Sequence, residues 1–92
     1  MENNSAIKAR ILKQKTMIFE RVIEEITKAV ESNEDVRYIK DIDFLGTNIV
    51  FKVQRDYWIY SLDKARVFFE SIEDYGKCKV CRNLIKNIKA NG

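Results

Sequence analysis

The sequence predicts an α+β domain with the order α-β-β-β-α-α, in which a three-stranded antiparallel meander packs with a long N-terminal helix and two short C-terminal helices. Three observations support this prediction. Apolar residues recur every three or four positions over residues 5–32, as in an amphipathic helix. Runs of β-branched and aromatic residues at 36–44, 49–53 and 57–60 are separated by turn signals, as in a meander. A further stripe at helical spacing follows Gly76.

Residues 5–32 are predicted to form one helix, with Ser5 or Asn4 as its cap. Its apolar stripe consists of Ile7, Ile11, Ile18, Val22 and Ile26, widened by Leu12, Phe19, Ile23 and Val30. Such a helix is about 42 Å long, whereas a small domain is about 30 Å across. We therefore expect its N-terminal third to project or to be covered by a second copy, and the wide stripe favours a homodimer. The alternative is a helix that kinks or begins near Lys13.

Two hairpins are predicted to bring the large side chains of three strands onto one face. Gly46 suits the first central position of a type II′ turn over 45–48. The predicted pairs are Phe44 with Ile49, Ile42 with Phe51, Asp41 with Lys52, Val53 with Trp58, and Phe51 with Tyr60. In this register both turns, the second at Arg55-Asp56, place Trp58, Tyr60 and Phe51 on the same buried face.

Two helices are predicted after the strands. Ser61 is a plausible N-cap, and Asp63 in the first turn complements the helix dipole. The apolar residues of this helix are Leu62, Ala65, Phe69 and Ile72, and Gly76 is placed to end it. The last helix has its stripe at Cys78, Cys81, Ile85 and Ile88, with Leu84 alongside.

Composition bounds the class of protein. The chain has 92 residues with a net charge of +3 and a pI of about 8.9, which fits one domain over residues 1–92 and is compatible with nucleic acid. Histidine is absent, so histidine general-base chemistry and histidine-ligated metal within one chain are excluded. No signal peptide or membrane span is visible, and we expect a cytoplasmic protein. No catalytic constellation is present, so we expect neither an enzyme nor a cofactor.

The pair Cys78-x-x-Cys81 is the one motif with recognisable chemistry, and it has three readings. Two thiolates at this spacing are half of a tetrahedral zinc site, which two chains together would complete, or they could join two chains as a disulfide. A redox role would be helped by the neighbouring cations, but the strand that precedes such motifs in thioredoxin-like proteins is missing. The third reading treats both cysteines as small apolar residues that face the core.

Basic residues gather near the two ends of the chain. We predict that they bind nucleic acid, as one positive surface if the two ends meet. Those of the first helix are Lys8, Arg10, Lys13 and Lys15, and those of the C-terminal segment are Lys77, Lys79, Arg82, Lys86 and Lys89. The alternative is two ordinary solvated helix faces.

The other predicted surface is the open face of the sheet. It is expected to expose Ile39, Lys52, Tyr57 and Ile59 as partner-binding residues, together with Asp41, Val50 and Gln54. This mixture of apolar and charged groups suits a protein partner or a second protomer.

The segment Ser61-Leu62-Asp63-Lys64-Ala65-Arg66 resembles the start of the last helix in double-stranded-RNA-binding domains, and the predicted order contains that family's α-β-β-β-α. The resemblance implies RNA binding. Asp63 stands where the family has a basic residue, and Phe68 and Phe69 stand where it has small ones, which limits the likeness to the fold. A similar element order also occurs in small phage and viral inhibitors.

The first functional hypothesis is a dimeric nucleic-acid-associated protein, and the alternative is a protein-binding module or inhibitor that uses the sheet face or the long helix.

Overall fold

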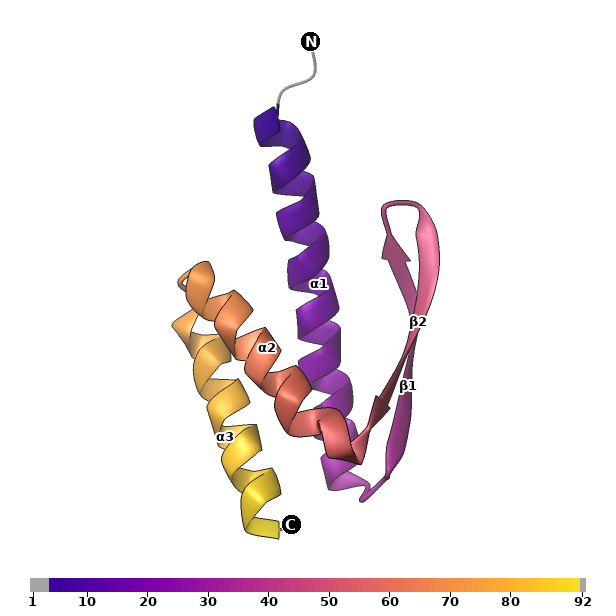
Figure 1. Ribbon diagram of the computed structural model, residues 1–92, viewed down its shortest axis with the longest axis vertical. Coiled ribbons are helices and arrows are strands. Elements are labelled where there is room, and N and C mark those ends of the chain that lie inside the picture. The colour runs from indigo at the N-terminus through magenta and orange to yellow at the C-terminus, as the bar shows by residue number, and fades with distance from the viewer. Residues whose placement is uncertain (1–3, 92) are drawn as a thin grey trace.

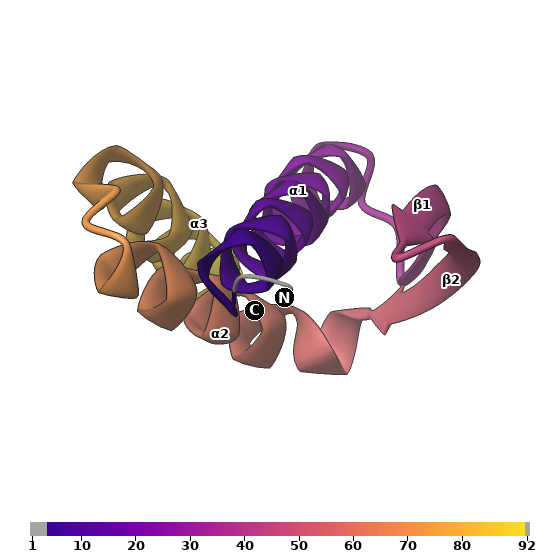
Figure 2. The same cartoon turned by 90° about the horizontal axis from the view of Figure 1, so that it is seen from above.

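The computed structural model describes residues 4–91 and is elongated, with extents of 53 × 28 × 15 Å. Its elements are the helix α1 (Asn4–Glu31), the strands β1 (Val36–Phe44) and β2 (Thr47–Gln54), a short 3₁₀ turn (Arg55–Tyr57), and the helices α2 (Trp58–Ser71) and α3 (Tyr75–Asn91). Figure 1 shows α1 along the long axis, with the hairpin on one side and α2 and α3 on the other. Seen from above, α3, α1 and the hairpin stand apart while α2 passes beneath them (Figure 2).

The long helix is confirmed, since α1 spans Asn4–Glu31 and does not begin near Lys13. Its C-terminal half supplies Ile23, Ile26 and Ala29 to the core, whereas residues 4–10 are all exposed. Figure 1 shows this N-terminal part extending beyond α2 and α3. Within the single chain, the first of the two expected arrangements, a projecting helix, is therefore present.

The predicted third strand is wrong, because the sheet has only two antiparallel strands within residues 4–91. Residues 57–60 instead lead into α2, which begins at Trp58, so Ser61 lies inside the helix and is not its cap. Trp58, Leu62, Ala65 and Phe69 are all buried in α2. Their spacing of four, three and four residues is that of one helix face, and burial of Trp58 on this face outweighs its preference for strands.

The end of α2 also differs from prediction. The helix stops at Ser71, Glu73 adopts a positive φ of 61°, and Gly76 is already the second residue of α3. The carboxylate of Asp74 accepts a hydrogen bond of 3.2 Å from the Lys77 N–H, which caps the start of α3. Gly76 therefore does not end α2, and this part of the prediction is wrong.

The hairpin is present, but its predicted register is wrong. Leu45 and Gly46 form a two-residue turn with φ of 52° and 84°, which pairs Phe44 with Thr47. Ile42 faces Ile49 and Ile39 faces Phe51, with a bulge between the two pairs. Two positive φ values correspond to a type I′ turn, whose twist suits a hairpin, in place of the expected type II′.

The bulge decides which side chains of β1 reach the core. It inserts one extra residue between Ile39 and Ile42, and Asp41 within it has a φ of 59°. As a result both isoleucines are buried, although strict alternation would place them on opposite faces. Tyr38, which was predicted to face the core, is 54% exposed, and Ile39, which was predicted to lie on the open face, is fully buried.

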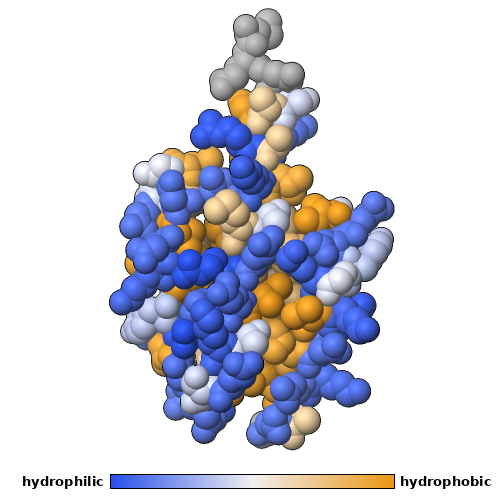
Figure 3. All heavy atoms as spheres, turned by 180° about the vertical axis from the view of Figure 1, so that it is seen from behind, coloured by the Kyte–Doolittle hydropathy of each residue, from blue (hydrophilic) through white to orange (hydrophobic). Residues whose placement is uncertain are grey.

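The core lies where α1, α2, α3 and the inner face of the hairpin meet. Phe19 of α1 stacks on Phe68 of α2 with ring centroids 4.8 Å apart, and Phe69 packs edge-on against both rings. The hairpin and the three helices do not enclose every apolar side chain. A group of apolar side chains remains visible from behind, in the lower half of the molecule (Figure 3). None of the helices in residues 4–91 is both long and apolar enough to cross a membrane.

Candidate functional site

Four cations form a stripe along the exposed side of α3, which we call the α3 basic stripe: Lys79, Arg82, Lys86 and Lys89. Spacings of three, four and three residues place them on one side of the helix. All four are exposed, and none forms an ion pair with another residue in 4–91. Tyr75–Asn91 contains no acidic residue, so the positive charge of this helix is not compensated within it.

Lys77, the fifth predicted cation of this segment, points elsewhere. Its Nζ lies 3.1 Å from Asp74 and 3.8 Å from Glu20 of α1, and 5.5 Å from the centre of the Phe69 ring. The hydrogen bond to Asp74 is the main cause that raises the pKa of Lys77 above its ordinary value. This lysine therefore joins α3 to α1, and its charge is compensated by two carboxylates.

The four predicted cations of α1 do not join the α3 basic stripe. Figure 1 shows the start of α1 and the end of α3 at opposite ends of the molecule, so the condition for one shared positive surface, that the chain ends meet, is not fulfilled within the chain. Lys8 and Lys15, seven residues apart, share one side of α1, whereas Arg10 and Lys13 share another. All four are exposed. The structure thus separates one basic region from the other, and only the α3 region is a single stripe.

The predicted partner-binding residues do not share a surface. Ile39 is fully buried behind the bulge, and Lys52 is exposed on β2. Tyr57 lies in the 3₁₀ turn with 58% of its surface exposed, and Ile59 is half-buried in α2. Because residues 57–59 are not part of the sheet, the open face predicted for a three-stranded sheet does not exist in that form.

Both cysteines face the core, as in the third reading of their motif. Cys78 and Cys81 are free thiols with 2% and 0% of their surfaces exposed. Cys78 Sγ lies 3.4 Å from the carbonyl oxygen of Arg66, which ties α3 to α2. Burial is the main cause that raises the pKa of Cys81 to about 11, so its nucleophilic thiolate form is scarce. Residues 4–91 contain no group of three His, Cys, Asp or Glu side chains placed to hold a metal ion.

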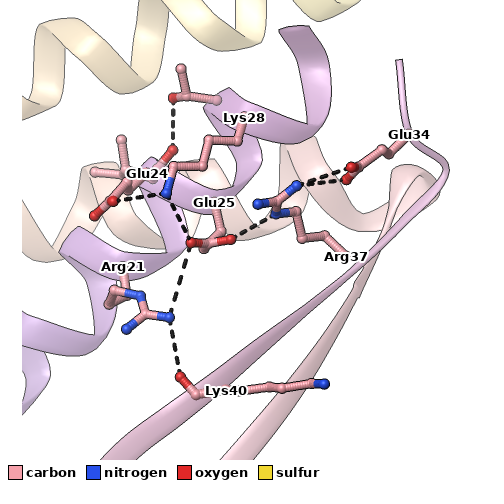
Figure 4. Close-up of polar contacts among 9 residues, drawn as sticks. Arg21, Glu24, Glu25, Lys28, Glu34, Arg37 and Lys40 are labelled. Carbon is pink, nitrogen blue, oxygen red and sulfur yellow. Dashed lines mark hydrogen bonds and ion pairs between the residues drawn. The ribbon is translucent and has the colours of Figure 1, made fainter. Parts of the chain in front are cut away.

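A cluster of charged side chains surrounds Glu25 and is structural. Figure 4 shows this carboxylate of α1 between Arg37 of β1 and the cations Arg21 and Lys28 of its own helix. Arg37 Nε donates a bond of 2.7 Å to Glu25, and its Nη1 lies 2.9 Å from Glu34. The bond from Arg37 is the main cause that lowers the pKa of Glu25, while burial acts in the opposite direction. Since its charges are paired, this cluster holds the hairpin to the helix.

An apolar groove, which the sequence analysis did not identify, lies between α1, β2 and the start of α2, and has a volume of about 330 Å³. One wall is formed by Ile18, Phe19 and Val22 of α1. The opposite wall is formed by Phe51, Val53 and Tyr60. The sequence predicts a strand at residues 57–60, whereas in the structure Tyr60 reaches the groove from α2.

A comparison with protein-family models, with curated proteins and with solved structures found no match to this chain.

Proposed function

We propose that this chain is a small non-enzymatic protein that associates with nucleic acid through the α3 basic stripe. The observation that carries the proposal is the alignment of Lys79, Arg82, Lys86 and Lys89 on one exposed side of a helix without an acidic residue. The stripe extends over eleven residues, or about 15 Å of helix from Lys79 to Lys89. Cations arranged in a row neutralise successive phosphates and release their counterions, which is the main source of sequence-independent affinity.

The packing of α3 favours nucleic acid over a lipid surface. A basic helix that binds membranes inserts its apolar side among the lipids. The apolar side of α3 is occupied, because Cys78 and Cys81 are buried against α2 and α1. The cationic side alone is left for an anionic partner, and a nucleic-acid backbone requires nothing more.

Salt dependence of binding tests this proposal. With four phosphate contacts on duplex DNA, the logarithm of the association constant should fall against the logarithm of salt concentration with a slope of about −3.6. Neutralising Lys79, Arg82 and Lys86 to glutamine should reduce the slope to about −0.9. The control replaces Lys40, Lys52 and Lys64, which removes the same charge from other elements and should leave the slope unchanged.

Two further arms complete the experiment. RNA of the same length distinguishes DNA from RNA as the partner, and replacement of Lys8, Lys13 and Lys15 measures the contribution predicted for α1. If neither nucleic acid binds at low salt, or if the control variant loses as much affinity as the α3 variant, the proposal is wrong.

Two other predictions belong to this proposal. We propose a cytoplasmic location, which the two unpaired thiols support, because disulfides are rare in reducing compartments. The homodimer stays a prediction; the exposed Ile7, Leu12 and Met17 in the N-terminal half of α1 support it, and sedimentation equilibrium measures it directly. The alternative function, a protein-binding module, is favoured by the groove beside α1.

A further inference from the structure

The groove between α1, β2 and α2 leaves large apolar side chains accessible to solvent. Phe51 is 37% exposed and Tyr60 is 62% exposed, although both border the core residue Val53 in the same groove. Accessible aromatic side chains that line a concave surface are typical of binding sites for protein partners.

The side of α1 that borders the groove continues beyond it towards the N-terminus. Lys8, Leu12, Lys15, Phe19 and Val22 follow one another at spacings of four, three, four and three residues, which places them on one side of the helix. Leu12 is 44% exposed. From Lys8 to Val22 this side is about 21 Å long, which matches an amphipathic partner helix of about four turns.

Positive charge accompanies the apolar surface along its whole length. Lys52 and Lys64 line the groove itself, and Lys64 Nζ lies 5.3 Å from the centre of the Tyr60 ring. Lys8 and Lys15 are exposed on the continuation along α1. None of the described residues that line the groove is acidic.

We propose that this surface binds the apolar side of an acidic amphipathic helix from another protein. Apolar residues of the partner at spacings of three and four would enter between Phe19, Phe51 and Tyr60, as in other helix-in-groove complexes. Its carboxylates would meet the four lysines at the rim, which sets orientation and accelerates association. The α3 basic stripe lies on another helix and shares no residue with this site.

Two other occupants, a second copy of this chain and nucleic acid, fit this surface less well. A second copy that laid its own N-terminal helix in the groove would bring its Lys8 and Lys15 towards Lys52 and Lys64, and like charges in contact oppose association. Nucleic acid would satisfy the lysines but would leave Phe51 and Val22 without an apolar partner.

A designed peptide tests the proposal on the full chain. The probe is a fluorescein-labelled 16-residue helix with leucine at spacings of three and four and glutamate on the remaining surface. The matched control peptide carries lysine in place of every glutamate. Fluorescence anisotropy should show at least tenfold tighter binding of the acidic peptide, and the difference should shrink at high salt, because rim charges are screened.

Variants locate the site. Lys52→Glu with Lys64→Glu should weaken binding of the acidic peptide about tenfold, because each charge pair becomes a like-charge contact. Lys79→Glu with Arg82→Glu makes the same change on α3 and should have no effect. Tyr60→Ala removes an exposed ring from the groove wall and should also weaken binding, and circular dichroism confirms that each variant is folded.

Three results would overturn this assignment. The first is equal affinity for the acidic and basic peptides, or no binding at 1 mM of either. The second is loss of binding in the α3 variant as large as in the groove variant. The third is a dimer of the free protein that Tyr60→Ala dissociates, which would assign the groove to a second copy. None of these three results bears on whether the α3 basic stripe binds nucleic acid, which the salt dependence measures. The two proposals can therefore fail separately.

Discussion

Arg37 of β1 donates a hydrogen bond of 2.7 Å from Nε to the carboxylate of Glu25 on α1. Glu25 is 8% exposed, and the guanidinium also reaches Glu34 in the turn between the two elements. The Arg37 side chain therefore joins three parts of the chain: β1, α1 and the turn that connects them. A two-stranded hairpin is marginal in water by itself, so its attachment to α1 depends on this bridge and on Ile39 and Ile42.

Removing the charge of Glu25 should therefore destabilise the protein. Glu25→Gln weakens a charge-assisted bond, while Arg37 keeps Glu34, so we expect a loss of about 1–2 kcal/mol in the free energy of unfolding. Urea denaturation measures the loss. Glu24→Gln on the exposed side of α1 is the matched control, and equal effects of the two substitutions would show that the bridge contributes nothing specific.

Stability should also fall in acid. The folded protein holds the pKa of Glu25 below its ordinary value of 4.5, with the bond from Arg37 as the main cause. The stabilisation is therefore fully present above that value and is lost as the pH falls through the lower pKa of the folded state. Urea midpoints measured from pH 7 to pH 3 should decline below about pH 4.5. Asp74, whose pKa is lowered mainly by the Lys77 N–H, contributes in the same direction. The Glu25→Gln variant should show a shallower decline, and an unchanged profile would contradict the assignment.

Trp58 and Tyr60 should differ sharply in their effect on stability. Trp58 is 2% exposed and Tyr60 is 62% exposed. Trp58→Ala should cost about 3–5 kcal/mol, whereas Tyr60→Ala should stay within about 0.5 kcal/mol. In a third strand both side chains would lie on the buried face and both substitutions would be costly. Urea unfolding of the two variants thus distinguishes the helix from the strand.

The cysteine thiols should be unreactive in the native protein. With a pKa of about 11, almost none of the Cys81 thiol is ionised at pH 8, and both cysteines are buried. A thiol reagent such as Ellman's should react slowly with the folded chain and rapidly with two thiols per chain in guanidinium chloride. Rapid native reaction would instead favour the redox reading, and zinc retained in native mass spectrometry would favour the inter-chain metal site.

A substitution in the hairpin turn should raise the stability of the protein. Leu45 has a φ of 52°, which disfavours a branched side chain, and it is followed by Gly46 at 84°. Leu45→Asn produces the Asn-Gly pair preferred in type I′ turns, so we expect about 0.5–1 kcal/mol of added stability. Gly46→Ala should have the opposite sign through its φ alone, because a Cβ at this position meets nothing within 4 Å. Thermal unfolding of both variants tests the turn type, and a gain in stability from Gly46→Ala would exclude it.

The spacing of apolar residues along the sequence is enough to predict the helices α1 and α3. The stripe from Ile7 to Val30 predicts α1, and the spacing of Cys78, Cys81 and Ile85 predicts α3 with both thiols inward. Both inferences hold because helix periodicity is a property of neighbouring residues. The Gly46 hairpin is likewise predicted by a short-range signal, although its turn type and register are not.

Tertiary structure alone decided the remaining features. Residues 57–60 suit a strand by propensity, yet Trp58 is buried when they extend α2, and propensity yields to packing. The bulge turns both Ile39 and Ile42 inward, to the core that β1 shares with α1. The groove and the ion pair between Lys77 and Glu20 bring together residues that are far apart in the chain. Contacts of this kind depend on which surfaces meet, and spacing along one segment carries no information about them.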